Sequence, residues 1–162
     1  MSLESIPISI EELIFGVASN LFVAAWLMLL VALWIKATSR WRARLLWAGG
    51  RLVPTLLLIG FLLGLILTRG MEPEGSIMTY DGMLRIFERP ERTLNVWIEI
   101  LALALFVTRW IIDHAETHSI KKWATTLVLF VAFISGGLGC LAYLLLVGIR
   151  RYTSQQAGTM SQ

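Results

Sequence analysis

Apolar residues in this chain are gathered into four runs, each long enough to form a helix across a lipid bilayer. The runs cover residues 13–35, 52–68, 94–112 and 123–149. The hydrocarbon core of a bilayer is about 30 Å thick and needs roughly 20 mainly apolar residues per helix. We therefore predict an all-α polytopic membrane protein, a bundle of four transmembrane helices. The spans and their short connections use nearly the whole chain, so residues 1–162 are expected to form a single membrane domain.

The longest connection, residues 69–92, has a different pattern and predicts turns followed by a short helix. Gly70, Pro73 and Gly75 are turn formers. Residues 83–87 mix apolar and basic side chains, which predicts a short amphipathic helix on the membrane surface that ends near Pro90. Such a helix could be a plain interfacial connector or could cap a cavity between the spans.

Small residues recur at helical spacing in three of the runs. They are Gly16, Asn20 and Ala24 in the first run, Gly60 and Gly64 in the second, and Ala132, Ser135, Gly139 and Ala142 in the fourth. Membrane helices associate through close backbone approach at small residues. We interpret these positions mainly as packing faces.

The third run carries its strongly polar and charged residues on one side. With about 100° of rotation per residue, spacings of three and four place six residues on one narrow face. They are Asn95, Glu99, Ala102, Phe106, Arg109 and Asp113. Ionisable side chains are costly at membrane depth and usually face the bundle interior or a wet cavity. This polar stripe is therefore the first candidate for a functional site.

Within the polar stripe, Glu99 is the candidate for chemistry. Arg109 and Asp113 lie near one membrane surface, where they can form a structural i,i+4 ion pair. Glu99 is deeper, and Asn95, one turn away, can donate a hydrogen bond to it; Asn20 of the first run is a second candidate partner. Three interpretations of Glu99 stay open: a protonated structural residue, a general acid or base, or a group that orients the polar end of a lipid-like ligand.

Aromatic side chains near the polar stripe could contact a conjugated or apolar ligand. The full set of candidate ligand-binding residues is Asn20, Asn95, Trp97, Glu99, Phe106, Arg109, Trp110 and Asp113. His114 and His118 have a spacing that can place two imidazoles on one metal ion. No third ligand can be identified, so we interpret them as a solvated loop and predict no metal site.

Composition excludes an ordinary soluble domain. The chain is 57% hydrophobic and 15% charged, whereas globular domains have about a quarter charged residues. Cys140 is the only cysteine, so it forms no intrachain disulfide and is expected to be a small packing residue. Residues 1–12 contain no lysine or arginine. They match neither a secretory signal nor a transit peptide, and we expect the first run to be retained as a helix.

Basic residues predict the orientation in the membrane. Lys36, Arg40, Arg42, Arg44 and Arg51 follow the first run with no acidic residue among them. Because positive loops favour the cytoplasmic side, we predict that the Lys36–Arg51 loop is cytoplasmic and that both termini lie on the other side, in a bacterial inner membrane or a thylakoid-type membrane. Tryptophans among these basic residues are typical of a juxtamembrane belt, so we do not expect nucleic acid as a partner.

Motifs in the third and fourth runs resemble a known family. They comprise Trp97-Ile98, Leu101, Leu105-Phe106, Arg109-Trp110-Ile111 and Asp113, followed by Gly136, Leu138, Gly139 and Tyr143. They are similar to the small four-helix membrane proteins related to the plant neoxanthin-synthesis factor, the "abscisic acid deficient" type-four family. The resemblance covers nearly the whole chain. It departs at Glu99, where the family pattern has histidine, at Ala104, where it has aspartate, and at Gly137, where it has proline.

The resemblance implies a membrane protein that acts in, or assists, carotenoid and xanthophyll metabolism, with a bound carotenoid or lipid and no other cofactor. Loss of the histidine and the aspartate would put the plant-type activity in question. An alternative function is a non-catalytic accessory or assembly subunit of a larger membrane complex, because no complete catalytic constellation is evident. The expected partners are the lipid bilayer, a carotenoid-like ligand, and other membrane proteins or a second copy of this chain. A small-solute carrier is third, since such carriers typically contain broken helices and we predict none here.

Overall fold

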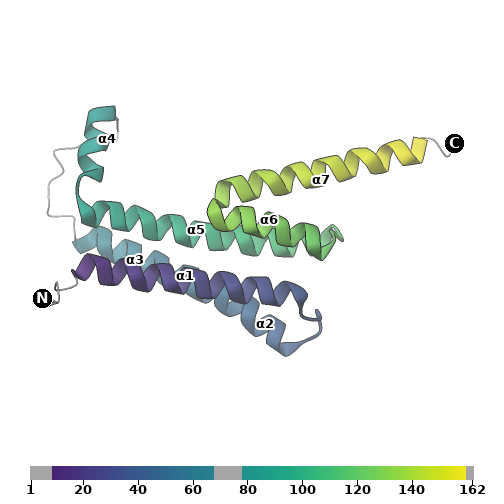
Figure 1. Ribbon diagram of the computed structural model, residues 1–162, viewed down its shortest axis with the longest axis horizontal. Helices are drawn as coiled ribbons and strands as arrows, with labels where there is room; N and C mark the ends of the chain where they lie inside the picture. Colours follow the sequence, from purple (N-terminus) through teal and green to yellow (C-terminus); the bar gives the residue numbers. More distant parts are fainter. Residues whose placement is uncertain (1–8, 68–77, 160–162) are drawn as a thin grey trace, which may run out of the picture.

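The computed structural model describes residues 9–67 and 78–159, and the side chains of these up to residue 150. Its regular elements are all helical within these ranges (Figure 1). They are α1 (Ile10–Trp34), α2 (Arg40–Trp47), η1 (Ala48–Leu52), α3 (Val53–Leu67), α4 (Tyr80–Phe87), α5 (Pro90–Thr117), α6 (Lys122–Ile134) and α7 (Gly136–Thr159).

Three helices of the described chain are long and apolar enough to cross a membrane. They cover Ile10–Trp34, Arg40–Leu67 and Pro90–Thr117, which confirms the first three predicted spans as helices of sufficient length. The second begins twelve residues before the predicted start at Leu52, because the basic segment continues into α3 through the π-helical turn η1. The predicted end of this span at Thr68 and the loop residues 69–77 lie outside the described residues.

Two glycines explain the π-helical turn. A side chain at Gly49 would meet the carbonyl oxygen of Ala25 at 2.7 Å, and one at Gly50 would meet the Arg109 side chain at 2.8 Å. The wider turn therefore brings bare backbone against α1 and α5 at one level. π-Helical turns are rare and occur mostly as single turns inside longer α-helices.

The predicted fourth span is wrong as a continuous helix. Residues 122–134 form α6, Ser135 is extended (φ −153°, ψ 114°), and α7 starts at Gly136 and turns back (Figure 1). We call α6 and α7 the hairpin. A side chain at Gly139 would overlap Ala132 of α6, and one at Gly136 would lie 3.0 Å from the Cα of Ala104. Glycine is a weak helix former that permits such close approach, and the expectation of unbroken helices fails here.

The hairpin also changes the expected topology. Arg150 of α7 donates from Nη1 to the carbonyl oxygens of His118 (2.9 Å) and Ser119 (2.7 Å) in the turn between α5 and α6. α1 begins at one end of the bundle, whereas α7 runs to the other end (Figure 1). This arrangement differs from the predicted one, in which both ends of the chain lie on one side of the membrane.

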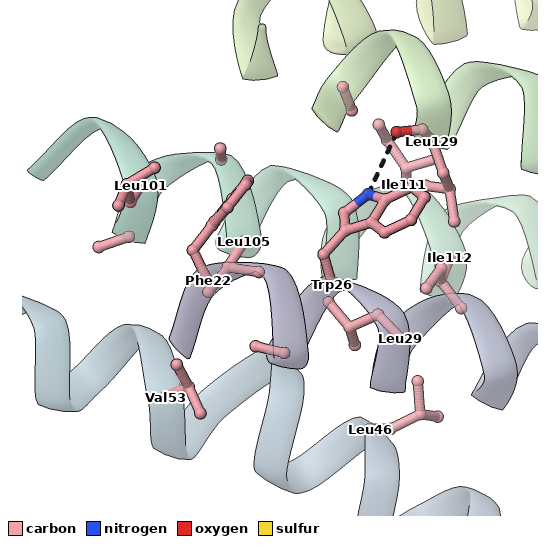
Figure 2. Close-up of a cluster of buried hydrophobic side chains, with 14 of the residues drawn as sticks. Phe22, Trp26, Leu29, Leu46, Val53, Leu101, Leu105, Ile111, Ile112 and Leu129 are labelled. Carbon is pink, nitrogen blue, oxygen red and sulfur yellow. Dashed lines mark hydrogen bonds between the residues drawn. The ribbon is translucent and has the colours of Figure 1, made fainter. Parts of the chain in front are cut away.

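The main core lies where α1, α5, η1 and α6 meet. Trp26 of α1 donates from its indole nitrogen to the carbonyl oxygen of Leu129 on α6 at 3.3 Å (Figure 2). Its ring packs against Phe130 and Phe133, with centroid distances of 5.2 and 4.8 Å. Because lipid tails are as apolar as these side chains, close packing and interhelical hydrogen bonds hold such a core together.

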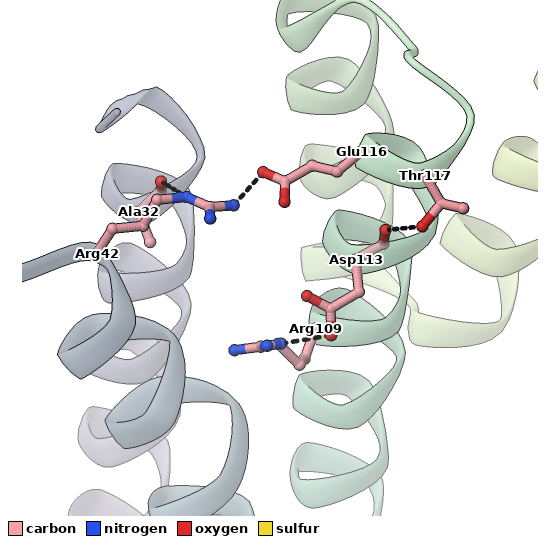
Figure 3. A network of polar contacts seen from close by, with 6 residues as sticks. All are labelled: Ala32, Arg42, Arg109, Asp113, Glu116 and Thr117. Carbon is pink, nitrogen blue, oxygen red and sulfur yellow. Dashed lines mark hydrogen bonds and ion pairs between the residues drawn. The ribbon is translucent and has the colours of Figure 1, made fainter. Parts of the chain in front are cut away.

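Arg42 connects three helices at the end of the bundle where α1 ends and α2 begins. This side chain is only 7% exposed, its Nε donates to the carbonyl oxygen of Ala32 at 3.1 Å, and its Nη2 pairs with the carboxylate of Glu116 (Figure 3). Ala32 lies in the last turn of α1, whose final carbonyls have no partner within the helix. One guanidinium therefore joins the ends of α1, α2 and α5.

Replacing Arg42 with alanine is expected to lower the free energy of unfolding by about 2 kcal/mol. The change leaves the Ala32 carbonyl without its donor and Glu116 without its cation. The figure is moderate because the Glu116 side chain is 42% exposed and can be solvated. Denaturation in mild detergent measures the loss. Arg44→Ala is the matched control, since Arg44 is exposed over the Trp41 ring and should change stability by less than about 0.5 kcal/mol. Equal losses in both variants would contradict the role of Arg42.

Candidate functional site

A cavity of about 620 Å³ opens between the start of α1, the end of α4 and the first three turns of α5. Its size is typical of small-molecule sites. The walls are mostly apolar and include Phe15 of α1, Phe87 of α4, and Val96, Trp97 and Ile100 of α5. We call this space the α1–α5 cavity.

Trp97 is held in the cavity wall by two contacts with α1. Its ring stacks on Phe15 with a centroid distance of 5.8 Å, and its indole nitrogen donates to Ser19 Oγ at 3.3 Å. Both contacts come from α1, so they hold the Trp97 ring in place between α5 and α1. Trp97 was a candidate from the sequence, and it is the one candidate ligand-binding residue of that set that lines the cavity.

Three carboxylates line the cavity at the end where α1 and α5 begin. Glu11 and Glu12 lie in the first turn of α1, and Glu88 follows the last residue of α4. Glu12 is oriented by a capping box, in which it accepts from the backbone N–H of Ser9 while Ser9 Oγ accepts from the N–H of Glu12, each at 3.2 Å. Acidic residues are favourable at a helix N-terminus, so local helix chemistry places charge at this opening.

The cavity exists because the hairpin is short. Phe15, Ser19, Phe22 and Trp26 share one face of α1, since their spacings are four, three and four. α6 fills the groove at the level of Phe22 and Trp26. The hairpin tip meets α5 at Ala104, near the middle of that helix. A complete fourth span would continue past this level, whereas here the groove beside Phe15 and Trp97 stays open.

The amphipathic helix α4 borders the cavity. It runs across the long axis of the bundle (Figure 1), and Tyr80, Met83, Leu84 and Phe87 expose apolar surface. The sequence predicted a short amphipathic helix within residues 83–87 that ends near Pro90, and the helix found is Tyr80–Phe87. Phe87 lines the cavity, which agrees with the interpretation of this helix as a cap. Its position in the membrane interface stays a prediction.

The polar stripe is one face of α5, but its members differ in burial. Asn95 is 6% exposed and packs against Gly64 of α3, where an added side chain would overlap its amide. Its Nδ2 is buried without a hydrogen-bond partner among the described residues. Ala102 is fully buried. The stripe therefore faces α3 at these levels and lies away from the cavity.

At the other end of the stripe, Arg109 and Asp113 form the predicted i,i+4 pair. The Arg109 Nε lies 2.8 Å from Asp113 Oδ2 (Figure 3). The aliphatic part of Arg109 packs on Gly50, which fixes the side chain against η1. The contacts of this pair support a structural role.

Glu99 is half-buried, and its carboxylate has no hydrogen-bond partner within the described part of the chain. It does not line the α1–α5 cavity, and neither does Phe106, which is 36% exposed. Asn20 is exposed on α1 and is not bonded to Glu99. The proposed pairing of Glu99 with Asn20 therefore does not form.

A second polar cluster was missed by sequence reasoning. His114 Nδ1 lies 2.8 Å from the hydroxyl of the fully buried Tyr143, and the His114 ring stacks on Trp110 and His118 at 5.0 and 4.0 Å. The interpretation of His114 and His118 as a solvated loop is wrong for His114, because α5 continues to Thr117. The spacing Trp110, His114, His118 could have indicated one helical face. The contact with Tyr143 depends on the hairpin, which no local pattern predicts.

Within the described ranges 9–67 and 78–150, no group of three or more His, Cys, Asp or Glu side chains is placed to hold a metal ion. The arrangement that remains is a lined, mostly apolar cavity with a polar opening. It can hold an elongated apolar molecule with one hydrogen-bonding end.

Comparison with known protein families identifies the chain's family. No curated protein and no solved structure matches the chain. A family model described as ABA DEFICIENT 4-like matches residues 13–143, which is more than half of the chain. The matched region runs from the second turn of α1 to Tyr143, and it includes the polar stripe, α4 and the apolar cavity walls. The chain therefore belongs to the ABA DEFICIENT 4-like family.

Proposed function

We propose that this membrane protein acts in, or assists, carotenoid and xanthophyll metabolism by holding the ring end of a xanthophyll in the α1–α5 cavity. The observation that carries the proposal is the cavity itself, with its stacked Phe15–Trp97 wall and carboxylates at one end. Membership of the ABA DEFICIENT 4-like family supports the ligand class.

The chemistry of the cavity suits such a ligand. A ring and the first part of a conjugated chain can pack on Trp97 and Ile100, since aromatic side chains provide large apolar contact areas. A ring hydroxyl at the opening can donate to a carboxylate, Glu11 or Glu88, because an ionised carboxylate is an acceptor. The α5 lining runs from Pro90 to Ile100. This is about 15 Å of helix at 1.5 Å per residue, so one end of a long polyene fits while the remainder extends into the bilayer.

Binding and presentation to other enzymes is the favoured role. Glu99, the sequence candidate for acid–base chemistry, lies outside the cavity lining, and the cavity wall itself has no nucleophile paired with a base. Glu99→Gln should leave ligand retention unchanged, because Glu99 does not line the cavity.

The experiment is purification in mild detergent from a host that makes xanthophylls, followed by an absorbance spectrum. We expect polyene bands to co-purify with the wild type. Trp97→Ala should retain less than about a fifth of the pigment per protein, because removing a central aromatic contact costs 1 kcal/mol or more. Trp123→Ala is the matched control, since Trp123 is exposed outside the cavity. Colourless wild-type protein, together with unchanged xanthophylls on gene deletion, would refute the proposal.

The accessory-subunit function is a second candidate because of the outer face of α1. Asn20 is exposed there in an apolar helix, between Ala24, also exposed, and Gly16, whose missing side chain would meet nothing within 4 Å. Amide side chains in membranes favour interhelical hydrogen bonds. The same mild-detergent preparation tests this function. Migration with larger partners that Asn20→Leu abolishes would support it, and a lone monomer would exclude it.

A further inference from the structure

The outer end of the α1–α5 cavity carries charge of one sign. Glu11, Glu12 and Glu88 line it, and the described lining residues include no basic side chain. Arg89 and Arg92 are close in sequence but are not part of the lining. Glu11 is half-buried, whereas Glu12 and Glu88 are exposed. The opening is therefore an anionic end on an apolar cavity.

Helix ends place these three residues at one end of the cavity. Glu12 is fixed by the capping box with Ser9. Glu88 caps the C-terminus of α4, with its backbone N–H bonded to the carbonyl oxygen of Leu84 at 3.0 Å. A ligand that enters the cavity with its apolar part inward must bring its polar end to this level.

Apolar walls alone cannot choose among the amphiphiles of a membrane. A hydrophobic pocket discriminates weakly between ligands of similar shape, and any fatty acyl chain could occupy a cavity with walls such as Phe15, Trp97 and Ile100. Discrimination then needs a repulsive element against the unwanted ligand. Like charges placed side by side provide one, because their repulsion weakens binding of the wrong partner.

We propose that Glu11, Glu12 and Glu88 are specificity-determining residues that exclude anionic amphiphiles and admit those with an uncharged hydroxyl end. An ionised carboxylate accepts a hydrogen bond from a hydroxyl group and repels another carboxylate or a phosphate. The inference rests on the proposed function for the natural ligand, a hydroxylated polyene. Its chemical content, alcohol over carboxylate, can be tested without that ligand.

The test compares retinol with retinoic acid, which share a ring and polyene and differ in their end group. Purified full-length protein in phosphatidylcholine nanodiscs is titrated with each at neutral pH, and binding is read as quenching of tryptophan fluorescence, corrected for partition into empty nanodiscs. We expect the wild type to bind retinol at least about tenfold more tightly, equivalent to a difference of 1.4 kcal/mol. In the E11Q/E12Q/E88Q variant the ratio should fall to within about twofold, mainly through tighter binding of retinoic acid.

A matched control removes charge from the same end of the bundle without altering the cavity lining. D81N/E91Q changes two carboxylates that do not line the cavity and should keep the wild-type ratio. Glutamine preserves the capping box, so the triple variant should remain folded, which a melting curve checks. Equal binding of both probes by the wild type, or an unchanged ratio in the triple variant, would overturn the inference.

The outcomes separate this inference from the proposed function. Selective retinol binding together with unchanged xanthophylls after gene deletion would support the carboxylate filter and refute the carotenoid role. Changed xanthophylls together with equal binding of the two probes would refute the filter alone. Failure of both probes to bind the wild type would refute the cavity as a ligand site and with it this inference.

Discussion

Replacing Gly139 with valine is expected to destabilise the hairpin by about 3 kcal/mol, because overpacking a close contact costs 1–3 kcal/mol and the obstacle here is largely backbone. A Cβ at this position would overlap the Cα and Cβ of Ala132 and lie 2.8 Å from its backbone nitrogen. α6 and α7 would have to separate. Since Tyr143 and Arg150 reach α5 through this packing, their contacts should be lost as well.

The measurement is the unfolding of the purified variant in mild detergent, compared with Gly148→Val. Gly148 lies on the same helix, and a side chain there would meet nothing within 4 Å. The control carries the same loss of glycine and the same β-branched side chain, so the difference between the variants isolates the contact with Ala132. If both variants melt at the same temperature, the hairpin does not depend on close approach at Gly139.

The second large effect concerns topology and is all-or-none. A reporter fused behind α7 and a reporter inserted between α1 and α2 are expected on the same side of the membrane. The turn at Ser135 reverses the chain, and Arg150 bonds to the turn that follows α5. A continuous fourth span would place the two reporters on opposite sides.

The charge distribution gives the expected side. With the chain reversed at Ser135, one end of the bundle carries these basic residues on loops and helix ends: Lys36, Arg40, Arg42, Arg44, Lys121, Lys122 and Arg150. Three lie near the other: Arg85, Arg89 and Arg92. Because positive charge favours the cytoplasm, we expect both reporters inside. An enzyme reporter active only in the cytoplasm tests this, and opposite locations would restore the four-span topology.

Sequence patterns predicted the elements whose causes are local. The apolar runs near α1, α3 and α5 are long enough to span a bilayer, the mixed pattern before Pro90 indicated α4, and four-residue spacing gave the Arg109–Asp113 pair. Each depends on residues within a few turns of one another. Helical periodicity and length are enough to recognise them.

The hairpin and the cavity could not be predicted in this way. The apolar run through Ser135 and Gly136 has the length of a span, and glycines are tolerated in membrane helices. The tip of the hairpin makes a contact across the fold, where Gly136 lies against Ala104 of α5. The cavity follows from the groove that the hairpin leaves uncovered, so Glu11 and Glu88 could not be recognised as its opening before α6 was placed.

Ala104 links this packing to the family comparison. The family pattern that the chain resembles has an aspartate at this position, and in this chain a Cβ at Gly136 would lie 3.2 Å from the Ala104 Cβ. An aspartate would need space that the hairpin tip occupies. The departure is therefore compatible with a tip that packs directly on α5, and Ala104→Asp should be unfavourable in this background.

A hairpin that stops halfway divides the bundle into two parts of unequal rigidity. Beside Trp26, Ile111 and Leu129, the helices α1, α5 and α6 pack closely together and these side chains are buried. Beside Phe15 and Trp97, fewer helices are in contact, and the α1–α5 cavity lies between the helices that line it. Regions with fewer buried contacts open locally at lower free energy. The half of the bundle beside the cavity can therefore open locally and admit a bulky ligand. The closely packed half keeps the helices together while it does so.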